Sequence, residues 1–326
     1  MTETTIAPKD DFNYYDGTIY WNNFDLINAH INRTISGDES VGWATHFVRT
    51  YGPKDKTLVL NCGNGWVERD LFRLGVVSHV VGTDINQKLL DQASAEARRI
   101  GMSAAYRVAD ANQFDGAGQT YDLVVNYAAM HHIARLNRMA EVVAEMTRGR
   151  GIFLNYDYVG PHRNQYDETT WLRCLEVRSR LPKKYQTSLG YPHVPTMIAS
   201  DPSEAVHSEL LLETLLRHFD VLESAKFGGG VAYILLFQNV ALYRDQHTEE
   251  GGAILNMIME EDRKLLAEHA SSNLFEFCVA RAKNPPPSPA LRTRWQDEED
   301  EREARARADG GRYYPPTPLE KILYPS

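Results

Sequence analysis

The amino-acid sequence predicts an α/β fold: a doubly wound, mostly parallel sheet that ends in an antiparallel strand pair, with helical additions at the N- and C-terminal ends. Two patterns lead to this prediction. Apolar runs typical of strands alternate with helical patterns between about residues 56 and 158, and a glycine turn follows the first run. Two later strand-like runs, 219–226 and 231–239, leave no room for a crossover helix, so we expect them to pair antiparallel.

The first strand leads into the turn around which the sheet is organised. Three apolar residues, 58–60, precede a turn with Gly63 and Gly65, and the residues that follow have helical spacing. Glycine lets the backbone bend sharply, and the free N–H groups at the start of the next helix can face a ligand. Because ligands of open α/β sheets bind at the carboxyl ends of the strands, we expect this turn to form the floor of a cofactor site.

The remaining elements follow the same alternation. Each further apolar run is expected to add a parallel strand through a right-handed crossover. The expected strands are 78–84, 104–108, 121–127 and 152–158. Two helices are expected ahead of the sheet, between about residues 22 and 51.

Shifts in composition divide the chain into four parts. These are an N-terminal arm with helices (1–55), a Rossmann-like domain (56–240) with a cap insertion (160–203), a C-terminal helical segment (241–284) and a flexible tail (285–326). Tyr14 and Tyr15 suit either a flap over a pocket or an arm packed on the surface. The helix expected over 250–283 carries an apolar stripe that suits either a core contact or a homo-oligomer interface. A short helix is expected near 296–308.

The composition limits the classes of function. The 326 residues carry a formal charge of −9, which argues against a nucleic-acid partner because phosphate binding needs clustered Lys and Arg. No apolar run is long enough to cross a membrane, and the first residues lack the apolar core of a secretion signal, so a cytoplasmic protein is expected. Three widely spaced cysteines indicate neither a disulfide framework nor a zinc cluster. The histidines lack H-E-x-x-H spacing, so no metal site is expected except through residues that are distant in sequence.

A nicotinamide dinucleotide site is one interpretation of the glycine turn. Such a site has the pattern G-x-G-x-x-G with an acid about 20 residues further on. Gly63 and Gly65 fit this pattern, and Asp84 ends the second strand, but Glu68 occupies the third glycine position. A side chain of that size would crowd the packing of helix on strand, so an oxidoreductase is disfavoured.

Further polar residues at strand ends point to another family. Asp110 follows the third strand and the segment 126–133 follows the fourth. Over roughly residues 56–240 this arrangement resembles the class I S-adenosylmethionine-dependent methyltransferases. The resemblance implies that the glycine turn binds the methionine part of S-adenosylmethionine, the acid after the second strand its ribose and the acid after the third its adenine. The implied cofactor-binding residues are Asn61, Gly63, Gly65, Asp84, Asp110 and Asn126.

The turn departs from the pattern of this family at two positions. Val59 stands where the family often has an acid, and Asn61 stands where it often has the first glycine. Asn tolerates left-handed backbone angles, so the turn can still form. These departures leave open a second interpretation, a cofactor-binding fold that has lost catalysis and serves as a partner or regulatory subunit. Asp84 also suits a turn or a helix cap, and Asp110 also suits an ordinary turn.

Methyl transfer requires that the acceptor be aligned and its proton removed. The candidate catalytic residues lie near the ends of the fourth and fifth strands, and they are His131, His132, Asp157 and His162. Histidine titrates near neutrality and can take a proton from a hydroxyl. His131 and His132 could each instead be a helix cap or a packed surface residue. Asp157 suits substrate orientation or support of a histidine, and also a satisfied loop carboxylate.

The segment after the fifth strand supplies the candidate substrate residues Tyr158 and Arg163. Residues 157–166 and 201–206 resemble a bacterial methyltransferase subgroup associated with saccharide or secondary-metabolite biosynthesis. Arg163 suits bidentate binding of an anionic substrate group or a surface ion pair. The sequence therefore predicts methyl transfer to a small molecule or sugar, at oxygen, with nitrogen as the nearest variant.

Overall fold

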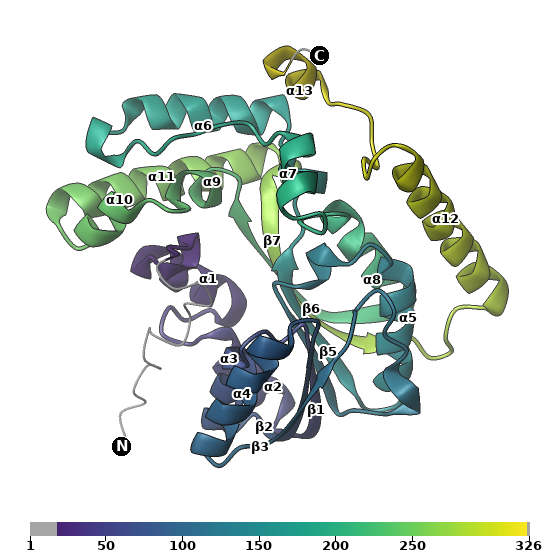
Figure 1. Ribbon diagram of the computed structural model, residues 1–326. Helices are drawn as coiled ribbons and strands as arrows, with labels where there is room; N and C mark the ends of the chain where they lie inside the picture. The colour runs from purple at the N-terminus through teal and green to yellow at the C-terminus, as the bar shows by residue number, and fades with distance from the viewer. Residues whose placement is uncertain (1–17, 325–326) are drawn as a thin grey trace, which may run out of the picture.

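The computed structural model describes residues 18–324, and its centre is a seven-stranded sheet in the order β3-β2-β1-β4-β5-β7-β6 (Figure 1). Tyr14 and Tyr15 lie outside the described residues. The strands are β1 (Lys54–Leu60), β2 (Val77–Asp84), β3 (Ser103–Val108), β4 (Leu123–Tyr127), β5 (Ile152–Tyr158), β6 (Phe219–Gly229) and β7 (Asn273–Ala282). The first five are parallel, and β7 runs antiparallel to both β5 and β6. The predicted fold class is confirmed.

Helices cover both faces of the sheet (Figure 1). They are α1 (Asp25–Ser36), α2 (Trp43–Tyr51), α3 (Trp66–Arg73), α4 (Gln87–Arg99), α5 (Leu136–Met146), α6 (Glu168–Arg180), α7 (Val194–Ser200), α8 (Leu211–His218), α9 (Ala232–Leu236), α10 (Val240–Asp245), α11 (Glu249–Glu268), α12 (Pro289–Ala308) and α13 (Pro318–Leu323). The two predicted N-terminal helices are confirmed. Among residues 18–324, no helix has the length and apolarity that a membrane span requires.

Alternate residues of β1 show why this sequence forms a buried central strand. Val59 packs into one apolar core, which includes residues of α1, α3 and α4. Leu58 and Leu60 pack into the other, which includes residues of α5 and α8. Side chains of a strand point to opposite faces in turn, so an unbroken apolar run is the pattern of a strand covered on both faces.

The antiparallel strand pair is present, but its second strand is not the expected one. The segment 231–239 was expected to pair with β6, but it contains α9, and β6 pairs with β7 instead. Asp262 of α11 is the physical reason. Its carboxylate is buried and accepts hydrogen bonds from the backbone N–H groups of Gly229, Val231 and Ala232 at 3.0, 2.7 and 2.9 Å. This binds the first turn of α9 and diverts the chain from the sheet.

The segment 250–283 is only partly helical. Helix α11 ends at Glu268, and the residues after it form β7, so the expectation of one helix to residue 283 is wrong. Ile258 and Leu265 of the apolar stripe are buried in the core, as the first of the two interpretations requires. The four-part division of the chain stays a prediction, although β7 belongs to the same sheet as β1–β6.

The C-terminal segment contains a longer helix than expected, because α12 begins at Pro289. It lies against α5. Glu299 is buried between the two helices, and its carboxylate accepts from the backbone N–H groups of Asn137 and Arg138 at 2.8 and 3.3 Å. A carboxylate at the start of a helix satisfies free N–H groups and complements the helix dipole.

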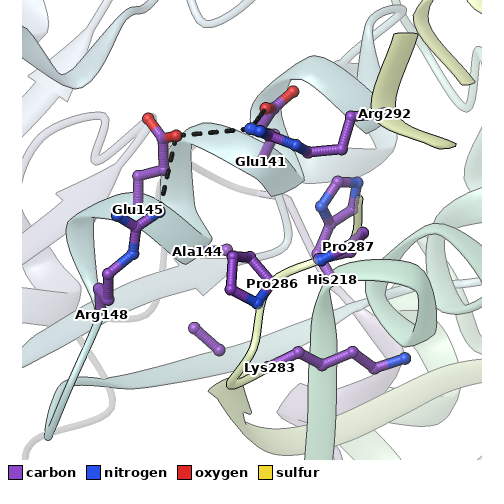
Figure 2. Close-up of a pocket in the computed structure, with 10 residues that line it drawn as sticks. Glu141, Ala144, Glu145, Arg148, His218, Lys283, Pro286, Pro287 and Arg292 are labelled. Atoms are coloured by element: carbon purple, nitrogen blue, oxygen red, sulfur yellow. Dashed lines mark hydrogen bonds and ion pairs between the residues drawn. The ribbon is translucent and has the colours of Figure 1, made fainter. Parts of the chain in front are cut away.

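A small polar pocket forms where this segment leaves the sheet (Figure 2). Its cavity of about 20 Å³ lies between α5, His218 at the end of α8, Lys283 after β7 and Arg292 of α12. Burial lowers the pKa of His218 to about 4. The cavity has room for about one water molecule. It adjoins the end of β7, which lies beside the start of β5, so it is at the opposite edge of the sheet from the predicted site.

Candidate active site

The glycine turn has the backbone that the family resemblance requires. Asn61 adopts a φ of 47°, in the left-handed region, and Gly63 and Gly65 have φ values of 56° and 78°. Asn61 therefore takes the conformation expected of a glycine at this position. Val59, at the position of the family's acid, is buried in the core.

Asp84 joins the turn to the end of β2. Its Oδ2 accepts from the backbone N–H of Gly63 at 2.8 Å, and its Oδ1 accepts from that of Asn86 at 2.8 Å. The helix cap is a different residue, because the Asn86 side chain accepts from the N–H groups at the start of α4. The carboxylate thus lies against the glycine turn, at the carboxyl edge of the sheet.

Ile85, directly after this acid, was not among the predicted site residues. Its side chain is 70% exposed, which is unusual for an isoleucine beside a buried strand end.

Asp110 is engaged in its own turn. Its Oδ1 accepts from the N–H of Asn112 at 2.9 Å and its Oδ2 from the side chain of Gln113 at 2.8 Å. In the structure the carboxylate of Asp110 therefore caps an ordinary turn, which is one of the two interpretations of the sequence. A contact from this carboxylate to adenine stays a prediction.

Glu68 does not crowd the packing of α3 on the sheet, contrary to expectation. Its side chain is fully buried against the hydroxyl of Tyr106 and the thiol of Cys62. Two glycines make the room, since a Cβ on Gly65 would lie 2.9 Å from the Tyr106 oxygen and a Cβ on Gly82 would lie 2.7 Å from the Tyr106 ring. Burial raises the pKa of Glu68 to about 7.

Asp157, at the end of β5, is the most completely bound carboxylate of the site. Its Oδ2 accepts from the Asn126 side chain at 2.7 Å and from the N–H of Met130 at 2.8 Å. Its Oδ1 accepts from the N–H of Tyr158 at 2.8 Å and lies 2.6 Å from Nδ1 of His131. Asn126 and Asp157 meet because β4 and β5 are parallel neighbours. Asn126 thereby orients Asp157, and its predicted contact with a cofactor stays a prediction.

This carboxylate determines the chemistry of His131. A carboxylate only accepts hydrogen bonds, so the proton of the imidazole is on Nδ1 and the lone pair of the neutral ring is on Nε2. Burial disfavours the charged ring, but the charge and hydrogen bond of Asp157 outweigh it, so the pKa of His131 is raised. The charged form of the His131 ring is therefore stabilised.

His132 lies beside His131 but differs in its electrostatics. The ring centroids are 4.1 Å apart, and Nδ1 of His132 lies 3.1 Å from the hydroxyl of Ser203. Burial and the neighbouring charge of His131 lower the pKa of His132. The structure thus makes His131 the ring that gains a proton first.

Glu204 is a further residue of this cluster that sequence reasoning missed. Its Oε2 lies 3.9 Å from Nε2 of His131 and 3.8 Å from Nε2 of His132. The three side chains bring ligand-type atoms within 4.8 Å of one another, a donor set that could also hold a metal ion. Ser203 and Glu204 are distant from the histidines in sequence, and no local pattern indicates their approach.

Tyr158 provides an apolar wall next to the histidines. The ring is buried, with its centroid 6.1 Å from that of His131 and 5.4 Å from that of Phe275. Its predicted contact with substrate stays a prediction.

Arg163 does not face an open site, contrary to the expectation of a substrate anchor or a surface ion pair. It is 1% exposed, and its guanidinium donates to the carbonyl oxygens of Asp201, Pro202 and Glu204 at 3.3, 2.6 and 2.9 Å. Those contacts fix the segment that carries Ser203 and Glu204, so Arg163 is a positioning residue.

His162 is also directed away from the Asp157 cluster. Its Nδ1 lies 2.7 Å from the carbonyl oxygen of Val206, and its ring packs on Tyr314 with 4.7 Å between centroids. Burial lowers the pKa of His162 to about 4. The structure therefore brings together His131, His132 and Asp157 of the predicted catalytic set and places His162 in a second cluster, with His207 and Glu209.

Comparison with known proteins matches the part of the chain that contains the glycine turn. A family model described as a methyltransferase domain matches residues 58–151. The ubiquinone biosynthesis O-methyltransferases of Agrobacterium fabrum and Rhizobium etli are each 32% identical to this chain over 97 residues, which are 30% of this chain and 38% of each relative. The chain therefore matches well under half the length of these curated relatives.

Solved structures with a similar arrangement are more distant in sequence. A geranyl diphosphate methyltransferase in complex with S-adenosylmethionine is 13% identical, with a TM-score of 0.46 over 74% of this chain and 84% of that one. The PH0226 protein from Pyrococcus horikoshii is 16% identical, with a TM-score of 0.40 over 71% of this chain and 82% of that one.

Proposed function

We propose that this chain, whose residues 58–151 match a family model described as a methyltransferase domain, is a class I S-adenosylmethionine-dependent enzyme that transfers a methyl group to a hydroxyl of a small molecule or saccharide. The observation that carries the proposal is the pairing of buried Asp157 with His131, at the same edge of the sheet as the glycine turn. A proton acceptor beside the predicted cofactor site is what this proposal needs, and the pair supports it.

The residues of the turn fit S-adenosylmethionine. Gly63 and Asp84 are already joined by a hydrogen bond, and a carboxylate oxygen can accept further hydrogen bonds from ribose hydroxyls. The exposed side chain of Ile85 suits one face of an adenine ring. When bound, S-adenosylmethionine supplies an electrophilic methyl group on its sulfonium.

The chain's own residues then hold and deprotonate the acceptor. Nε2 of His131 takes the hydroxyl proton, and Asp157 stabilises the imidazolium that forms. Ser203 and Glu204 offer hydrogen-bonding groups to an acceptor with several hydroxyls, and Tyr158 excludes water on one side. The reaction needs only alignment and proton removal from the protein.

The choice of oxygen over nitrogen rests on His131 and on the matched relatives. A neutral imidazole with an elevated pKa suits the removal of a hydroxyl proton. The curated relatives are named O-methyltransferases of ubiquinone biosynthesis, and the family model matches residues 58–151, a range that does not include His162 or the segment with Glu204. A biosynthetic role in the cytoplasm is part of this proposal, and the acceptor is assigned only as a class.

A catalytically inactive partner subunit is the alternative, and Val59 favours it because the family's acid is missing there. Calorimetric titration with S-adenosylmethionine and, separately, with NAD tests the cofactor. We expect only S-adenosylmethionine to bind, and Asp84→Ala to weaken it roughly tenfold to a hundredfold through loss of charged hydrogen bonds. Asp91→Asn, at an exposed position of α4, is the matched control.

An acceptor screen over hydroxylated small molecules and sugars follows. Methylated product with wild type and at least about a hundredfold less with His131→Ala would support the assigned base. Cofactor binding without any product across the screen would favour the inactive subunit.

A further inference from the structure

A second cluster of metal-ligand side chains lies outside the Asp157 site. His162 follows β5, and His207 and Glu209 precede α8, so the cluster joins two segments that are distant in sequence. One ligand atom from each of the three side chains lies within 4.8 Å of the others.

His207 is buried without a hydrogen bond. The side chain is 0% exposed, and within residues 18–324 neither ring nitrogen has a partner at hydrogen-bond distance. Nδ1 is 3.9 Å from Oε1 of Glu209 and Nε2 is 3.8 Å from Oε1 of Glu303, beyond hydrogen-bond length. Within the described chain Oε2 of Glu209 is likewise buried and without a partner. Buried polar atoms are almost always paired, so the unpaired atoms of His207 and Glu209 point to an additional ligand at this position.

We propose that His162, His207 and Glu209 bind a divalent transition-metal ion of the zinc class. Two imidazoles and one carboxylate are a donor set that such ions prefer, and an open fourth position is usual for it. The carboxylate also supplies negative charge to balance the cation.

The surrounding contacts orient the ligands for this purpose. Nδ1 of His162 lies 2.7 Å from the carbonyl of Val206, which can only accept, so its proton is on Nδ1 and the lone pair on Nε2 is free for a metal. The Tyr314 hydroxyl donates to Oε1 of Glu209 at 2.9 Å and leaves Oε2 free. Such outer contacts are the usual way in which a protein fixes metal ligands.

A bound ion would also hold together two segments that are distant in sequence. Arg163 N donates to the carbonyl of Ala205 at 2.8 Å, and Val206 N donates to that of His131 at 3.0 Å. The ion therefore ties the segment after β5 to the segment that carries Glu204, behind the Asp157 cluster. The inference does not depend on methyl transfer, because it concerns the stability of this junction.

Metal binding to the full, untagged chain after treatment with a chelator tests the proposal. We expect zinc titration by calorimetry to give one strong site, and cobalt(II) to give the visible absorption of a low-coordinate site. Glu209→Gln and His207→Asn should each weaken zinc binding at least about tenfold. Glu213→Gln and His247→Asn, at exposed positions, are matched controls and should bind as wild type does.

The His131, His132 and Glu204 group is the competing location, so His131→Asn is included. Zinc should raise the melting temperature of wild type and of His131→Asn but not of Glu209→Gln, whose partly exposed side chain makes it the variant that keeps its fold. Failure of wild type to bind zinc, or binding that is lost in His131→Asn and retained in Glu209→Gln, overturns the proposal.

Discussion

Oδ1 of Asp157 lies 2.6 Å from Nδ1 of His131, and the other oxygen of the same carboxylate is held by Asn126 and Met130. The carboxylate of Asp157 is thus fixed in one orientation. Its negative charge raises the pKa of His131. Two strands and the turn after β4 produce this pair.

The pair predicts a particular titration. His131 should titrate above 6.5 in wild type, so kcat/KM should rise with pH through that raised pKa as the ring becomes neutral. Asp157→Asn should move the pKa of His131 down, because burial then acts without the opposing charge. NMR titration of the imidazole C–H signals measures both values without an acceptor. An unchanged pKa in the variant would contradict the assignment.

The raised pKa of buried Glu68 should make the stability of the protein depend on pH. The unfolded carboxyl loses its proton near 4.5, whereas the folded one keeps it to about 7, so the free energy of unfolding should fall as pH rises across this window. The fall attributable to this residue is about 3 kcal/mol. Glu68→Gln should remove it, and exposed Glu145→Gln should not. Urea unfolding at a series of pH values provides the test, and parallel curves for wild type and Glu68→Gln would refute it.

Because Arg163 is buried against backbone carbonyls, replacing it should lower the stability of the protein and not substrate affinity alone. Arg163→Met leaves three backbone carbonyls without their donor and should lower the free energy of unfolding by about 2–4 kcal/mol. Arg180→Met, in which a more exposed side chain is changed, should lower it by less than about 0.5 kcal/mol. Denaturant unfolding compares the two. Equal effects would mean that the buried guanidinium contributes nothing specific.

Because Glu299 of α12 accepts hydrogen bonds from the first turn of α5, we expect α12 to stabilise the start of α5. Glu299→Ala should cost about 1 kcal/mol, as the loss of a helix cap does. The amides of Asn137 and Arg138 should then exchange their hydrogens faster, because they lose their acceptor. Glu301→Ala, at an exposed position of the same helix, is the control. If exchange at these two amides stays the same, the cap is not functional in solution.

The strands β1–β5 could be predicted because their signals are local. An apolar run, a turn and a helical pattern occur within a few residues of each other, as around Gly63. The partner of β6 could not be predicted, because α9 depends on a carboxylate of α11 that is distant in sequence. β7 could not be predicted because its apolar residues continue the apolar pattern of α11, so the sequence favours one long helix.

The same distinction applies to the site. Asp157 and His131 could be predicted singly, since each ends or follows a strand, and their meeting follows from the parallel pairing of β4 with β5. Glu204 could not, because it reaches the histidines through a turn fixed by Arg163. The burial of Arg163 could not be predicted either, because contacts between a guanidinium and backbone carbonyls leave no pattern in the local sequence.

The late arrival of β7 has a consequence for how the chain emerges during synthesis. Tyr158 at the end of β5 pairs with Phe275, so the edge of β5 has no strand to pair with until α6–α11 have been made. An open apolar strand edge is a template for association with other chains. The nascent protein therefore passes through a long interval in which its central sheet is unfinished and the edge of β5 is open.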